Sequence, residues 1–78
     1  MEDSNLRIEQ LNKQIEENPS DEGAFLERGR IYWALGNRSR AINDYLAAQR
    51  INPNGHASQL LKASYDILDF YNKDLYNP

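Results

Sequence analysis

The side chains that could carry out covalent or metal chemistry are few and widely spaced in this 78-residue chain. There is no cysteine, which excludes a disulfide framework, a thiolate metal site and a thiol nucleophile. His56 is the single histidine, so one chain cannot supply a zinc site of several imidazoles. We expect His56 to have a solvated surface role, and Asp44 and the other carboxylates to occupy solvated helix positions.

No group of reactive residues converges in the sequence. The acids Asp66, Asp69 and Asp74 do not cluster with other ligands, so they suggest no metal site. No serine, histidine and acid are arranged like a catalytic triad, and no glycine-rich loop is suited to phosphate. We therefore expect a chain that is not an enzyme and that uses no metal and no cofactor.

Arg30 and Trp33 are better suited to binding than to catalysis. Trp33 is the only tryptophan of the chain, and tryptophan and arginine are enriched at the hot spots of protein interfaces. The alternative is that Trp33 covers a following helix as ordinary core. The sequence leaves these two interpretations of Trp33 open.

The net charge of −3 is unevenly distributed. Residues 1–27 hold eight acids and two bases, residues 28–55 hold one acid and five bases, and residues 56–78 hold three acids and two bases. Overall acidity argues against nonspecific binding to nucleic acid, which depends on neutralising phosphates. The simplest explanation of the uneven charge is that acidic and basic helices pack side by side.

Nothing in the sequence indicates a membrane protein. No apolar run approaches the length that spans a bilayer, and the first residues, MEDSNLRIEQ, are acidic and polar, unlike a signal peptide. We expect a cytoplasmic protein without membrane association.

Apolar residues recur at helical spacing through most of the chain. They predict one domain over 1–78 with four helices and a polar tail, at residues 5–17, 21–35, 38–51, 55–72 and 73–78. No stretch alternates with a period of two, so no sheet is expected. Because the predicted loops are short, consecutive helices should be antiparallel. The predicted fold class is all-α.

Polar residues and glycine mark the predicted helix ends. Asp3 or Ser4 is suited to cap the first helix, Ser20 the second and Asn54 the fourth. Gly36 follows the second helix, where a left-handed residue is common.

Two prolines define an internal period. Pro19 and Pro53 are 34 residues apart, and each ends a helical segment, IEQLNKQIEENP and AINDYLAAQRINP. When the prolines are aligned, Ile8 falls on Ile42. A period of this length built from two helices is typical of one class of helical repeat.

Residues 22–55 resemble one complete tetratricopeptide repeat. The matching residues are Phe25, Gly29, Tyr32, Gly36, Ala41, Tyr45, Ala48 and Pro53. The resemblance implies a short right-handed superhelical stack in which Gly29 and Ala41 lie where the two helices cross. Residues 4–21 then resemble the second helix of a preceding repeat, and residues 56–72 resemble the first helix of a following repeat or a capping helix. Arg28 and Arg38 depart from the family pattern, and we expect Arg28 to pair with Glu9 or Glu16.

The resemblance implies a noncatalytic interaction module whose concave face binds a peptide or a protein. That face would carry the predicted partner-binding residues Leu26, Arg30, Trp33 and Asn54. Some members of the family bind a C-terminal carboxylate there through an asparagine at the position of Glu27. Because a glutamate would repel a carboxylate, we do not expect that ligand.

The aromatic residues near the C-terminus suggest an alternative. Tyr65, Phe70 and Tyr76 fall partly off the apolar stripe of the fourth helix, and exposed aromatics of this kind mark interfaces. They predict either a homodimer or a tail that folds back over the core. In the homodimer the chain is a self-associating structural unit that pairs through this aromatic helix or through the uncovered side of the N-terminal helix.

Overall fold

The protein is a stack of four helices. The computed structural model describes the backbone of residues 3–76 and the side chains of residues 3–70. The helices are α1 (Ser4–Glu17), α2 (Glu22–Ala34), α3 (Arg38–Ile51) and α4 (Ala57–Tyr76). No strand is present in residues 3–76, so the predicted all-α fold class is confirmed.

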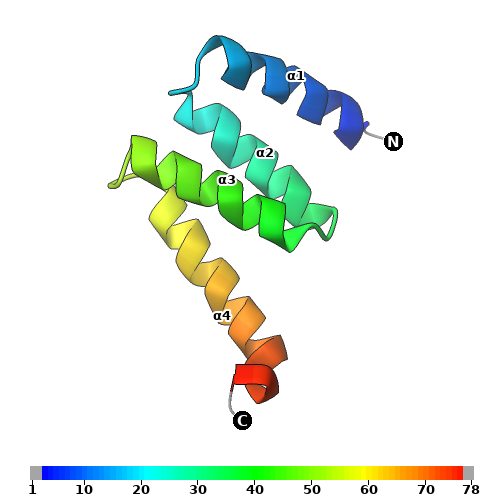
Figure 1. The fold of residues 1–78 in the computed structure, drawn as a ribbon, viewed down its shortest axis with the longest axis vertical. Helices are drawn as coiled ribbons and strands as arrows, with labels where there is room; N and C mark the ends of the chain where they lie inside the picture. Colours follow the sequence, from blue (N-terminus) through cyan, green and yellow to red (C-terminus); the bar gives the residue numbers. More distant parts are fainter. Residues whose placement is uncertain (1–2, 77–78) are drawn as a thin grey trace.

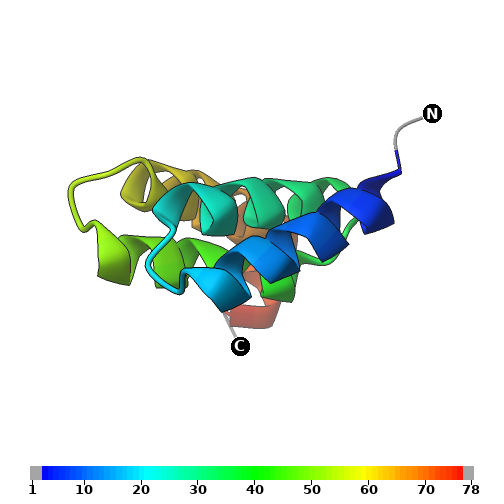
Figure 2. The same ribbon diagram turned by 90° about the horizontal axis from the view of Figure 1, so that it is seen from above.

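Each helix packs on the next one along the chain, and consecutive helices are antiparallel (Figure 1). The first three lie side by side, whereas α4 crosses α3 at a steeper angle and runs away from the other helices. Figure 2 shows the same stack from above. The molecule is flat, with extents of 44 × 33 × 17 Å. One end of the stack is therefore α1 and the other is the projecting α4.

Side chains of aspartate and asparagine cap the first three helices. The Asp3 carboxylate accepts from Leu6 N at 3.1 Å, and Asn37 plays the same part for α3. The predicted cap of α2 at Ser20 is wrong, because Asp21 accepts from Ala24 N at 3.1 Å. Ser20 instead lies in the preceding turn, where its N–H donates to the Asn18 side chain at 3.2 Å.

The predicted bounds of α4 differ from those in the structure at both ends. Asn54 does not cap the helix, since its N–H donates back to the Asn52 side chain at 3.2 Å within the turn that follows α3. The helix therefore begins later, at Ala57. It also continues to Tyr76, through most of the segment predicted as a polar tail. Between the start of α4 and Tyr76 there is no glycine or proline to end it.

The core lies where α2, α3 and α4 meet. Its buried members are Leu26, Ala41, Tyr45, Ala48, Ala57 and Leu61, and the partly buried residues that pack on them include Phe25, Tyr32 and Trp33. At the other end of the stack, Ile8 and Leu11 of α1 are buried. The core is small, which fits a chain of this length.

Gly29 provides the close contact between α2 and α3. A Cβ atom at Gly29 would lie 2.6 Å from Cε1 of Tyr45 and 3.1 Å from Cβ of Asp44. Real Cβ atoms do not approach so closely, so only glycine lets these helices pack at this spacing. Gly36 has φ of 87° at the end of α2. Both predictions for these glycines are confirmed.

Candidate partner-binding surface

The α2 helix has two different sides, and each one borders a hollow. We call the hollow between α2, α3 and α4 the apolar hollow. It has a volume of about 240 Å³ and is lined by Arg30, Trp33, Tyr45, Leu60, Ala63, Ser64 and Ile67. The structure thus brings two of the four predicted partner-binding residues, Arg30 and Trp33, to one place.

Trp33 is both a core residue and a residue of the candidate surface, the two interpretations that the sequence left open. Its side chain is half-buried and packs against the core cluster, yet it also lines the apolar hollow. The Arg38 guanidinium lies over the indole, with Cζ at 4.1 Å from the ring centroid. A cation at this distance is attracted by the face of the ring and holds it in place. The indole is therefore presented to the hollow in a fixed orientation.

Arg30 supplies the charge at the hollow. It is exposed, and no group among residues 3–70 accepts a hydrogen bond from it or lies within ion-pair distance, although its charge interacts with that of Glu27. Burial raises the pKa of the Tyr45 hydroxyl, and the positive charge of Arg30 offsets part of that rise. Arg30 can therefore form a hydrogen-bonded ion pair with a further negative group.

The structure places the other two predicted partner-binding residues elsewhere. Leu26 is only 7% exposed and belongs to the core, because it lies beneath α3 and α4. Asn54 is exposed in the turn between α3 and α4 and does not line the hollow. Neither residue adds to the surface that Arg30 and Trp33 form.

Residues of α4 complete the hollow, and the sequence analysis did not assign them to a site. Leu60, Ser64 and Ile67 share one apolar stripe, a pattern that indicates a buried face. Ile67 is nevertheless 40% exposed. The Ser64 hydroxyl donates to the Leu60 carbonyl at 2.7 Å, so it is satisfied within its own helix. The apolar stripe was the sequence signal that could have indicated these residues. Only the angle of α4 shows that the other helices leave part of the stripe exposed.

The other side of α2 is occupied by an ion pair. Arg28 donates from Nε and Nη2 to the two carboxylate oxygens of Asp44, at 2.9 and 2.7 Å, and from Nη1 to Asn12 at 2.7 Å. These contacts to Asp44 raise the pKa of Arg28. The predicted partners Glu9 and Glu16 are wrong, because Arg28 pairs with Asp44 of α3 and contacts α1 at Asn12.

Asp44 is also not the solvated carboxylate that we expected. It is only 4% exposed, since its helix packs closely on α2 at Gly29. A carboxylate so buried needs a partner, and the two-pronged contact with Arg28 supplies one.

The ion pairs do not join the acidic segment to the basic one. Among residues 3–70 they are Arg7–Glu27, Arg28–Asp44 and Lys62–Asp66, each inside one of the three charge segments. Close ion pairs between the acidic and basic segments therefore do not explain the uneven charge, although α1 packs beside α2. The positive charge of the middle segment is left partly exposed at Arg30 and Arg40.

Glu27, at the position where the resemblance places an asparagine in some family members, forms an ion pair with α1. Arg7 donates to its two oxygens at 2.6 and 2.8 Å. This hydrogen bonding lowers the pKa of Glu27 and raises that of Arg7. The Arg7–Glu27 ion pair thus connects α1 with α2.

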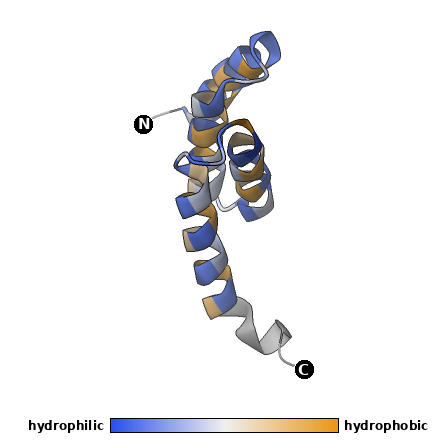
Figure 3. Cartoon of the chain, turned by 90° about the vertical axis from the view of Figure 1, so that its left-hand side faces the viewer, coloured by the Kyte–Doolittle hydropathy of each residue, from blue (hydrophilic) through white to orange (hydrophobic). Residues whose placement is uncertain are grey.

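Three apolar side chains stand out on α4. Tyr65, Ile67 and Phe70 are 45%, 40% and 73% exposed. Figure 3 shows the helix projecting beyond the other three. The third residue predicted for self-association, Tyr76, has a side chain outside the described residues.

Comparison with known proteins agrees with this architecture. Residues 23–54 match the family model of the tetratricopeptide repeat, so this segment is a tetratricopeptide repeat. That family is generally a noncatalytic scaffold for binding proteins. No curated protein and no solved structure gave a significant match. Within residues 3–76, no helix is long and apolar enough to cross a membrane. Among the side chains of residues 3–70, no three acids or histidines gather as a metal site.

Proposed function

We propose that the protein binds a peptide segment of a partner protein at the apolar hollow. The observation that carries this proposal is the pairing of an oriented, half-buried Trp33 with an exposed, unpaired Arg30 at the rim of one hollow. Tryptophan and arginine supply a large share of the binding energy at protein interfaces. The predicted cytoplasmic location stays a prediction.

The hollow is suited to one apolar side chain. Its volume of about 240 Å³ is below the roughly 300–1,000 Å³ of pockets that enclose small molecules. Its walls are mostly apolar, from Trp33, Leu60 and Ile67. Arg30 favours a carboxylate next to that apolar side chain. The partner segment therefore contains an apolar anchor beside an aspartate or glutamate.

Selection from a library of random displayed peptides tests the proposal without a known partner. We expect enrichment of sequences with an apolar residue beside an acid. Their affinity should fall by about 2 kcal/mol in Trp33→Leu, as for a hot-spot residue, and by a smaller amount in Arg30→Gln. Arg50→Gln removes an exposed arginine of α3 and is the matched control.

One result would contradict the proposal. If peptides are enriched but bind Arg30→Gln and Trp33→Leu as tightly as the parent, the binding surface lies elsewhere. Circular dichroism of each variant establishes that the fold is intact before affinities are compared.

A second candidate function is self-association through α4. The exposure of Ile67 and Phe70, which are three residues apart on one projecting helix, favours it, since these two side chains would be buried together against a second copy. Light scattering over a concentration series should then give the mass of two chains, falling to one chain in Phe70→Ser. A mass of one chain throughout contradicts self-association and leaves the peptide-binding proposal in place.

A further inference from the structure

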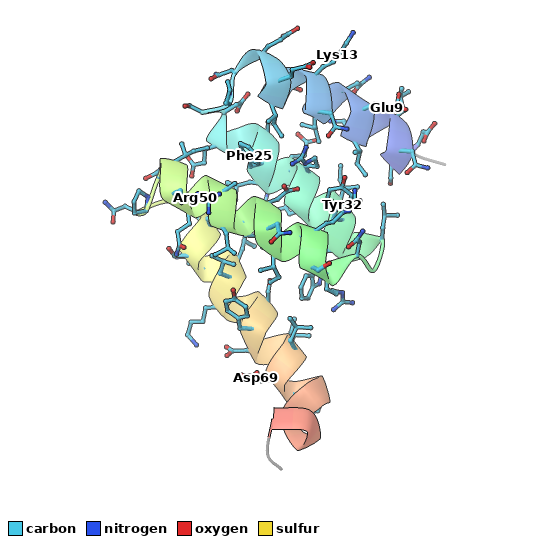
Figure 4. The ribbon with its side chains drawn as sticks, viewed as in Figure 1. Glu9, Lys13, Phe25, Tyr32, Arg50 and Asp69 are labelled. Atoms are coloured by element: carbon cyan, nitrogen blue, oxygen red, sulfur yellow. The ribbon has the colours of Figure 1, made fainter. Side chains whose placement is uncertain are left out.

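A second hollow lies on the opposite side of α2, toward α1 and α3. We call it the polar hollow. It has a volume of about 350 Å³ and is lined by Asn12, Arg28, Tyr32, Arg40, Asn43 and Asp44. Every lining residue has a polar side chain. The labelled Tyr32 projects from α2 near α3 in Figure 4.

The charges deepest in this hollow are already satisfied. Both oxygens of Asp44 accept from Arg28, and the third nitrogen of Arg28 donates to Oδ1 of Asn12. Asp44 is therefore a fixed support, and the positive charge of Arg28 balances the charge of its carboxylate. The pair Arg28–Asp44 adds no net charge to the hollow.

Several hydrogen-bond donors around this hollow remain without a protein partner. Because Oδ1 of Asn12 faces Arg28, its Nδ2 has two N–H groups to donate. Arg40 donates only one long bond, 3.5 Å from Nη1 to the Tyr32 hydroxyl oxygen, so the Tyr32 O–H can donate outward. Asn43 is exposed, and none of residues 3–70 forms a hydrogen bond with its side chain. Donors from three helices thus surround one hollow.

We propose that the polar hollow binds a single carboxylate, that of an acidic side chain on a partner protein. A carboxylate offers only acceptors when ionised, which complements these donors. A guanidinium matches its planar shape with two parallel hydrogen bonds. Arg40 supplies this guanidinium, and Tyr32, Asn12 and Asn43 donate around it.

The charge of the hollow favours a carboxylate over a phosphate group. With Arg28 neutralised by Asp44, Arg40 is the one uncompensated charge among the lining residues. A single positive charge balances a monoanion but only part of the charge of a phosphate, which is nearly doubly ionised at neutral pH. This site is separate from the apolar hollow, which lies across α2, and the proposal does not depend on the proposed function.

Titration followed by nuclear magnetic resonance tests the site directly. The probe is N-acetylglutamate amide, and the uncharged control is N-acetylglutamine amide. We expect saturable shifts of the side-chain amide signals of Asn12 and Asn43, with a dissociation constant in the millimolar range. The indole signal of Trp33 should stay in place, which separates this site from the apolar hollow.

Three variants and one competing anion decide the outcome. Arg40→Gln should weaken binding by at least about tenfold, as expected for the loss of a charge-assisted contact, whereas Arg50→Gln on the same helix should not. Tyr32→Phe, which removes only the hydroxyl, should weaken it less. The proposal is overturned if the glutamate probe shifts neither amide, if Arg40→Gln binds it unchanged, or if methyl phosphate binds more tightly.

Discussion

The two sides of α2 differ in how they are built. Toward α3, Gly29 lets the helices pack closely, and the buried Arg28–Asp44 pair lies beside that contact. Toward α4, Arg30 and Trp33 line a hollow that no side chain fills. One helix therefore both holds the repeat together and presents a surface. The difference predicts that changes on the first side alter stability and that changes on the second side alter binding.

The largest effect is expected at the closest contact. Gly29→Leu forces α2 and α3 apart, because even a Cβ would lie 2.6 Å from Tyr45. We expect a loss of at least about 3 kcal/mol in the free energy of unfolding, measured by urea denaturation. Gly23→Leu, at an exposed position of the same helix, is the control. Similar melting of the two variants would contradict the helix packing described above.

The next effect is expected at the buried ion pair. Asp44→Ala leaves the Arg28 guanidinium half-buried with Asn12 as its only hydrogen-bonding partner, and should cost about 2 kcal/mol. The double variant Arg28→Met Asp44→Leu removes both charges and should recover most of that loss. Urea denaturation of the single and double variants makes the comparison. If Asp44→Ala is as stable as the parent, the pair does not hold α2 to α3.

A smaller effect is expected on the α4 side. Arg38→Gln removes the cation over the Trp33 ring and should cost about 0.5–1 kcal/mol. Trp33 fluorescence should change as well, because the ring gains freedom. Arg30→Gln should change stability by less than about 0.5 kcal/mol, as for an exposed residue without a partner. A large loss of stability in Arg30→Gln would remove the distinction between the two sides.

The smallest effect on stability is expected at the Arg7–Glu27 pair between α1 and α2, where stability should depend on pH. The Arg7 contact lowers the pKa of Glu27 in the folded protein. Its contribution to stability is therefore present above the unfolded pKa, near 4.3, and is lost as the pH falls through the lower folded pKa. Melting curves between neutral and strongly acidic pH should show this loss, and Glu27→Gln should reduce it. The change is small because the pair is solvent-exposed.

The sequence predicted the repeat well because its spacing reflects close contacts. Gly29, Ala41 and Tyr45 recur at positions where two helices must touch, and the structure places all three in that contact. The predicted helix ends were less accurate, as the wrong caps at Ser20 and Asn54 show. Several residues in each turn can accept a hydrogen bond from the next helix, and only the folded turn selects one.

The buried Asp44 was missed although a signal was present. It lies three residues after Ala41 and four before Ala48, so all three share the face of α3 that meets α2. Because Asp44 is charged, we expected its side chain to be exposed to solvent. The apolar hollow could not be predicted either, because it depends on the angle at which α4 leaves α3. Periodicity identifies a buried stripe but does not give that angle.

One measurement tests the central claim, that the α4 side of α2 is the binding surface. Trp33 is the only tryptophan, so its indole N–H gives one resonance that reports on the apolar hollow. A peptide with an apolar residue beside an acid, selected as described above, is titrated into the parent protein. The account predicts a saturable shift of the indole signal, weakened in Arg30→Gln. Binding that leaves the indole signal unmoved would contradict it.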